Sequence, residues 1–100
     1  MTYQEQKASI TKTIKSQEVF QKVLTEKIGA AMVEQQRITG MKDLPEFNSE
    51  KLGNVQMSLT YYIAALNKRL KSSLSEVDRL IDFKANLLQY RTQSAIRSLR

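Results

Sequence analysis

The side chains that could carry acid–base or metal chemistry in this sequence are few. Cysteine and histidine are absent, which removes thiol and imidazole nucleophiles, a histidine base and every zinc site built from sulfur and nitrogen ligands. The densest acidic cluster comprises Asp43, Glu46 and Glu50. These carboxylates could act as an acid–base pair or hold a hard cation, but no other catalytic group accompanies them. Since acidic residues at a helix start complement the helix dipole, we interpret the cluster as a helix start. We expect no enzyme activity, cofactor, metal or small-molecule substrate.

The composition favours a single all-α domain over residues 1–100. Only three glycines and one proline are present, too few for the turns of a β-sandwich or barrel. Hydrophobic residues make up 41% and charged residues 26%, as in ordinary folded chains. Residues 1–12 show no signal-peptide core, and no apolar run approaches ~18 residues. We therefore expect no membrane span, and a protein that is cytoplasmic or exported by a route without a cleaved signal peptide.

The first predicted helix covers residues 4–39, which contain no proline and one glycine. Apolar and glutamine side chains recur at spacings of three and four, so they share one helical face. Glutamines on this face could fix the register between helices or simply face solvent. The residues of this face are Ile10, Ile14, Gln17, Gln21, Leu24, Ile28, Ala31 and Gln35.

A turn is expected at about residues 40–48, followed by a long helix over about 49–99. Gly40 suits a left-handed position that ends the first helix. Asp43 and Glu46 resemble a capping box around Pro45. Asn48 or Ser49 is the other possible cap. The next helix therefore starts between residues 43 and 50.

An apolar stripe marks the second long helix. Its members step by three and four residues in a pattern that repeats every eleven residues, or about 3.67 residues per turn, close to a straight α-helix. We predict that this stripe is a partner or oligomer interface, because an exposed apolar stripe of this size marks an interaction site. The residues are Leu59, Ile63, Leu66, Leu70, Leu74, Val77, Ile81 and Leu88.

Residues 71–78, KSSLSEVD, decide between two architectures. Ser73 and Glu76 fit a capping box, which would break the helix near residues 71–76 and produce a compact three-helix bundle. No glycine, proline or asparagine ends a helix there, and the stripe crosses the segment without losing phase. We favour an all-α, elongated helical hairpin of two long helices and keep the three-helix bundle as the alternative.

Positive charge is concentrated in the C-terminal third. Residues 66–100 carry eight basic and three acidic residues, a net charge of +5 within a total of +6. Such a surface could contact nucleic acid or an acidic partner. It could equally be the solvated back of an amphipathic helix. The candidate contact residues are Lys68, Lys71, Arg79, Arg97 and Arg100.

Residues 45–81 resemble the C-terminal hairpin of type III secretion inner-rod and needle subunits, and more distantly flagellar rod proteins. The matching positions are Pro45, Leu52, Gln56, Leu59, Tyr62, Leu66, Val77 and Leu80. The likeness covers about a third of the chain, which continues beyond the point where inner-rod chains stop. It implies a small helical subunit of a large assembly.

We therefore expect a non-enzymatic structural, adaptor or chaperone-like subunit that acts by helix–helix packing, as a homo-oligomer or coiled coil or within a secretion or other assembly. The alternative is a nucleic-acid-binding helical protein that uses the basic C-terminal third.

Overall fold

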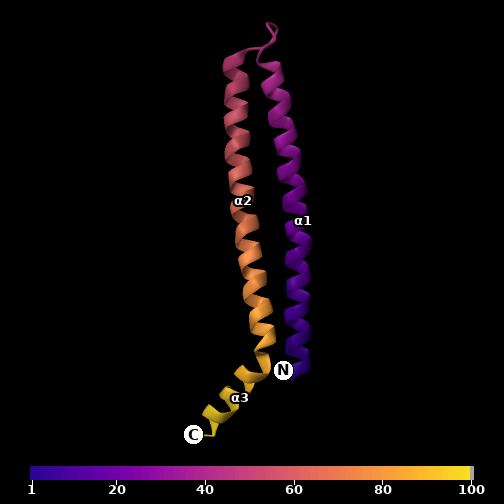
Figure 1. The fold of residues 1–100 in the computed structure, drawn as a ribbon, viewed down its shortest axis with the longest axis vertical. Helices are drawn as coiled ribbons and strands as arrows, with labels where there is room; N and C mark the ends of the chain where they lie inside the picture. Colours follow the sequence, from indigo (N-terminus) through magenta and orange to yellow (C-terminus); the bar gives the residue numbers. More distant parts are fainter. Residues whose placement is uncertain (100) are drawn as a thin grey trace. The chain divides into compact units, whose positions relative to one another are not determined.

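The computed structural model describes residues 1–99, and these residues contain three helices and no strand: α1 (Tyr3–Met41), α2 (Ser49–Ala85) and α3 (Leu87–Ser98) (Figure 1). The predicted all-α hairpin of two long helices is confirmed. The chain divides into two units. We call Gln21–Ser72 the turn unit, and Met1–Phe20 with the residues from Ser73 onward the end unit. In the described part of the chain, no helix combines the length and apolarity needed to cross a membrane.

The start of α2 is capped by Asn48, one of the expected caps. Its Oδ1 accepts hydrogen bonds from the amides of Glu50 and Lys51 at 3.0 and 3.1 Å, which satisfies two of the donors that a helix start leaves free. The other expectation for this region, a left-handed Gly40, is wrong. Gly40 lies inside α1, and no glycine among the described residues has a positive φ. The amide of Lys42 continues the helical pattern by donating to the carbonyl of Ile38 at 3.1 Å.

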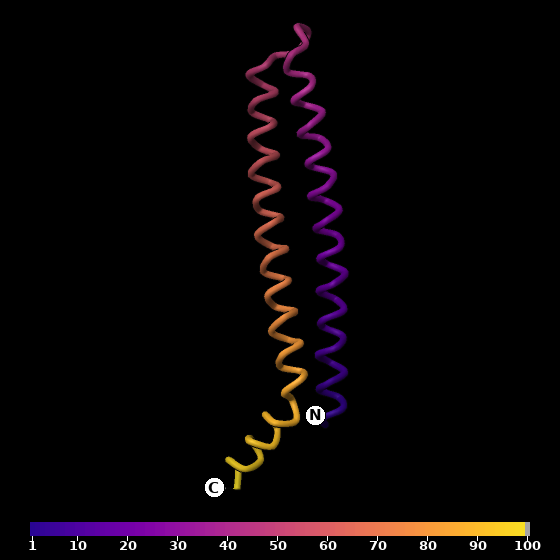
Figure 2. Tube along the Cα trace, viewed as in Figure 1, coloured from indigo at the N-terminus to yellow at the C-terminus, as the bar shows by residue number. Residues whose placement is uncertain are grey.

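Residues 71–78 lie inside α2, and their coil continues without interruption (Figure 2). The alternative of a helix broken near residues 71–76 is therefore wrong. Ser73 does not act as a cap, because it is buried and its hydroxyl donates to a side chain of α1. A serine inside a helix is tolerated here because its hydroxyl has this tertiary partner.

The break in the second helix comes later than residues 71–76, at Asn86. The expected helix over 49–99 is wrong in this respect, because α2 ends at Ala85 and α3 begins at Leu87, turning away from the line of α2 (Figure 1). The side-chain amide of Asn86 donates to the carbonyl of Asp82 at 2.9 Å, and the Asn86 backbone amide donates to the same carbonyl at 3.1 Å. A side chain that competes for the backbone ladder in this way bends helices.

The face of α2 and α3 that is turned inward follows a seven-residue repeat, which we call the seam. Its members alternate steps of three and four residues, as in helices that pack side by side along their length. The sequence prediction placed Leu74 and Ile81 on one stripe with Leu70 and Val77, but Ser73 and Leu80 share the inward face with these two residues instead. An eleven-residue repeat would drift away from a helix partner. The half-buried or buried seam positions are Gln56, Leu59, Ile63, Leu66, Leu70, Ser73, Val77, Leu80, Lys84, Leu87 and Arg91.

Each unit buries its own part of the core. In the end unit, Leu87 is fully buried in a cluster with Ile10, Ile14 and Val77, against which Tyr3 and Leu80 pack. In the turn unit, the buried apolar residues are Leu24, Ala31, Ile38 and Leu66. The inward face of α1 agrees with the face predicted from sequence.

The position of the seam can be tested with two adjacent leucines. Leu87→Ala should lower the free energy of unfolding by about 2–5 kcal/mol, because Leu87 is completely buried. Leu88→Ala is the matched control and should cost less than about 1 kcal/mol, because Leu88 is 62% exposed. Urea denaturation followed by circular dichroism measures both values. Equal losses for the two variants would contradict the seven-residue seam.

Candidate interaction surface

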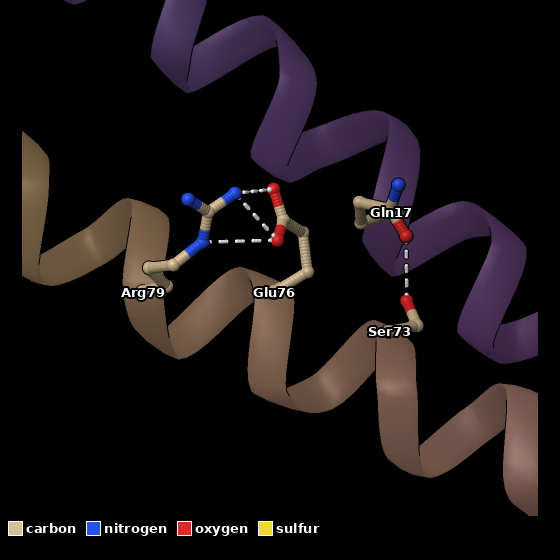
Figure 3. Close-up of polar contacts among 4 residues, drawn as sticks. All are labelled: Gln17, Ser73, Glu76 and Arg79. Atoms are coloured by element: carbon tan, nitrogen blue, oxygen red, sulfur yellow. Dashed lines mark hydrogen bonds and ion pairs between the residues drawn. The ribbon is translucent and has the colours of Figure 1, made fainter.

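A polar pair interrupts the apolar seam of the end unit. The hydroxyl of Ser73 on α2 donates to Oε1 of Gln17 on α1 at 2.7 Å (Figure 3). Both residues occupy seam positions, and Ser73 is 5% exposed. A buried polar pair stabilises only the register in which its two members meet, because any slip leaves a polar group without a partner.

A larger polar network lies near the turn, inside the turn unit. Nε2 of Gln35 donates to Oγ1 of Thr60 at 2.7 Å. Nε2 of Gln56 donates to Oγ1 of Thr39, and Nζ of Lys42 donates to Oε1 of Gln56 at 3.3 Å. These residues line a groove with Glu50, Met57 and Tyr61. The side-chain nitrogens of Gln35, Lys42 and Gln56 all donate to partners within the network. The polar lining of the groove is therefore explained by contacts that align α1 with α2. Of the two alternatives for the glutamines, Gln17 and Gln35 form hydrogen bonds between the helices, as the register alternative requires.

The predicted interface residues divide into two sets. Five of them lie on the seam, where α1 of the same chain covers them: Leu59, Ile63, Leu66, Leu70 and Val77. The other three lie outside the seam and are half exposed or more. Leu74 is 49% exposed, Ile81 is 52% exposed and Leu88 is 62% exposed. The structure thus separates a stripe that the sequence pattern had joined.

We call Leu74, Ile81 and Leu88 the apolar strip. Each residue directly follows a seam position, and the three are spaced seven residues apart. The strip is confined to the end unit. In the turn unit the corresponding positions of α2 are Gly53, Thr60 and Asn67. A surface helix normally carries polar residues outside its packed face; the strip departs from this pattern, as do the exposed Val55, Met57, Tyr61 and Tyr62 in the turn unit.

The acidic cluster forms no catalytic or metal-binding arrangement. Asp43 and Glu46 lie in the turn, and Glu50 lies in the first turn of α2, where its charge complements the helix dipole. Within residues 1–99, no group of three carboxylates is placed to hold a metal ion. Only Glu50 therefore lies at a helix start, and the interpretation of Asp43 and Glu46 as helix-start residues is wrong because α2 begins at Ser49.

The candidate basic residues are distributed over both units. Lys68 and Lys71 belong to the turn unit, and Arg79 and Arg97 to the end unit; Arg100 lies outside the described residues. All four described residues are exposed.

Arg79 is engaged by an acidic neighbour on its own helix. Its Nη2 donates to both carboxylate oxygens of Glu76 at 2.7 and 2.8 Å (Figure 3). Hydrogen bonding to Glu76, and then its charge, raises the pKa of Arg79, which stays cationic. A phosphate would have to compete with that carboxylate.

Two further contacts of the end unit were missed from sequence. Nη1 of Arg91 donates to the carbonyl of Met1 at 3.1 Å and to Oε1 of Gln6 at 2.9 Å, which ties α3 to the start of α1. The rings of Phe83 and Tyr90 stack with centroids 5.3 Å apart across the bend. The seven-residue spacing of this aromatic pair was the available signal, whereas nothing in the sequence paired Arg91 with the N-terminus.

Comparison of the chain with protein-family models, with curated proteins and with solved structures finds no match.

The Gln17–Ser73 pair can be measured by a double-mutant cycle. Gln17→Ala, Ser73→Ala and the double variant should yield a coupling free energy of about 1 kcal/mol, because each single change leaves a part-buried polar group without its partner. Urea denaturation measures the free energy of unfolding of the wild type and of the three variants. A control cycle with Thr11→Ala in place of Gln17→Ala should show no coupling. A coupling near zero for the first cycle would mean that the pair does not contribute to register.

Proposed function

We propose that this protein is a non-enzymatic helical interaction subunit whose apolar strip packs against a helix of another polypeptide. The observation that supports this most directly is the exposure of the strip beside a seam that is already covered. Leu74, Ile81 and Leu88 are at least 49% exposed although α1 is available within the chain. Burying three such side chains would contribute favourably to association.

The spacing of the strip favours a helix as its partner. Leu74 and Ile81 are seven residues apart on α2 and therefore lie on nearly the same line along that helix, whereas Leu88 lies on α3, beyond the bend at Asn86. Another helix can run along the α2 part of the strip, whereas a small molecule would contact only one member.

A structural, adaptor or chaperone-like role in a larger assembly, such as a secretion system, is the context that we propose. It is supported by the likeness of residues 45–81 to inner-rod and needle subunits. Of the eight residues that carry the likeness, five lie on the seam: Gln56, Leu59, Leu66, Val77 and Leu80. The likeness therefore concerns how the hairpin packs internally, and the apolar strip is the surface left for assembly.

The proposal can be tested by photo-cross-linking from the strip. A photoreactive phenylalanine analogue at position 81 should cross-link to a polypeptide in cells that make the protein naturally. The matched control places the analogue at Ser75, which is exposed on the same helix but outside the strip. Absence of a cross-link at position 81, or equal cross-linking at both positions, would overturn the proposal.

A variant of the strip should lose association without losing its fold. Ile81→Asp places a charge where an apolar contact is proposed, and because Ile81 is 52% exposed, helicity and unfolding free energy should change by less than about 1 kcal/mol. With the photoreactive analogue placed at position 88, cross-linking of the Ile81→Asp variant should fall at least tenfold. Ser75→Asp adds the same charge outside the strip and should leave cross-linking unchanged.

Salt dependence separates this proposal from nucleic-acid binding by the basic residues. Between about 0.1 and 1 M salt, association through the apolar strip should lose much less affinity than binding through phosphate contacts, because apolar contacts are not screened by salt. Steep loss of association with salt, together with loss on Arg97→Glu, would favour the nucleic-acid alternative.

A further inference from the structure

We propose that the occupant of the apolar strip is α1 of a second copy of this chain, in a two-fold dimer of end units. This inference rests on the proposed function, because it names the partner of the same surface. It is supported by three properties of the end unit: a lysine-rich face beside the strip, acidic residues on the far side of the strip, and small side chains on the facing part of α1.

The lysine-rich face lies on the same side of the seam as the strip. Gln17 and Ser73 meet across the seam, and in an antiparallel pair the residues that follow two facing positions point to the same side. Leu74 follows Ser73, so the strip and the corresponding side of α1 form one continuous face. A shallow groove on α1 contributes to this face, and we call its three cations, Lys7, Lys12 and Lys15, the lysine face.

The charges of the end unit are arranged so that two copies attract in one orientation. This side of α1 carries Lys7, Lys12 and Lys15 and one acidic residue, Glu18, whereas Asp78 and Asp82 lie beside the strip on α2. The side of α1 is therefore positive and the side of α2 negative. Placing α1 against α1 would bring like charges together, which opposes association. A two-fold axis parallel to the helices instead places α1 of each copy over α2 of the other, with opposite charges facing.

The register within one chain fixes which residues meet in this dimer. Because a parallel two-fold axis preserves height along the helices, and Gln17 is level with Ser73, Lys12 is level with Asp78 of the second copy. Ala8 is level with Asp82 of the second copy, and Lys7 lies within one residue of that level. Each aspartate therefore has a lysine within reach.

The side chains opposite the strip are small enough to receive it. At the height of Ile81, α1 of the second copy presents Ala8 and Thr11, which also line the groove of the lysine face. Small residues let two helices approach closely, so the branched side chain of Ile81 can lie between them. The two strips would then converge toward the two-fold axis, as the inner residues of a four-helix bundle do.

The face is large enough for a specific but modest contact. The part of α1 in the end unit, Tyr3–Phe20, is about 27 Å long at 1.5 Å per residue, and two helices of about 10 Å each make a face about 20 Å wide. The face therefore covers roughly 540 Å² per copy and roughly 1,080 Å² for the pair, which reaches the ~1,000 Å² expected of a specific interface. We expect dimerisation in the micromolar range.

The first test traps the orientation with cysteines, since the natural chain has none. One variant carries Gln4→Cys and the other carries Ala85→Cys, two exposed positions whose heights match in the proposed dimer. A mixture of the two variants should form a disulfide-linked heterodimer under mild oxidation, and each variant alone should form at least tenfold less dimer. Equal cross-linking in all three samples, or none in the mixture, would overturn the proposed orientation.

The second test reverses the charges. Lys7→Glu with Lys12→Glu should weaken the dimer at least tenfold in light scattering across a hundredfold concentration range. Adding Asp78→Lys and Asp82→Lys to the same chain should restore it, because the pairs are re-formed with opposite sign. Lys22→Glu is the control outside the end unit and should have no effect. Weakening without rescue would overturn the paired arrangement.

The remaining outcomes separate this inference from the function on which it rests. A chain that stays monomeric up to ~0.5 mM while position 81 cross-links to a different polypeptide would overturn the second copy and leave the proposed function intact. Binding of monomers to vesicles of one part phosphatidylglycerol and three parts phosphatidylcholine, lost on Lys12→Glu with Ile81→Asp, would identify an anionic lipid surface as the occupant and overturn both.

Discussion

The packing of α1 against α2 along a seven-residue seam is the constraint on which the rest of the structure depends. Two helices stay in contact over many turns when their inward residues recur with one fixed period, which here is 3.5 positions. The seam therefore determines which side chains of α2 pack against α1 and which remain exposed. Leu80 packs inward and Ile81 remains exposed, although the two are adjacent and equally apolar. The candidate interaction surface is what this division leaves exposed.

Polar residues on the seam make the division specific. An all-apolar seam could slip by a full repeat and still bury leucines, but such a slip would separate Ser73 from Gln17 and Thr60 from Gln35. The net strength of each bond is modest, because water competes for both groups in the unfolded chain. Their value lies in the penalty that every other register would incur. The apolar strip and the lysine face keep a defined height relative to each other for the same reason.

The helical class, the turn and the inward face of α1 could be predicted from sequence, because each depends on local spacing. Ile10 and Leu24 lie two seven-residue repeats apart, and the inward face that they mark is unambiguous in the sequence. The inward face of α2 could not, because Leu74 and Ile81 extend the apolar pattern as well as Ser73 and Leu80 do, and only the contact with α1 distinguishes them. The bend at Asn86 was also missed. Asn67 lies inside α2, so an asparagine alone does not predict a bend. The bend at Asn86 is accompanied by the burial of Leu87 and by the hydrogen bond of Arg91 to Gln6, and the partners in these contacts are distant in the sequence.

The polar network near the turn has a consequence for the order of folding. Its hydrogen bonds join residues separated by 14 to 25 positions, such as Lys42 with Gln56 and Gln35 with Thr60. The hydrogen bonds that link the two chain segments of the end unit join residues separated by 56 to 90 positions. Since loop closure costs more entropy as the loop lengthens, the network near the turn can form first and shorten the loops that remain. The surface proposed for assembly is therefore completed last, after the register has been chosen.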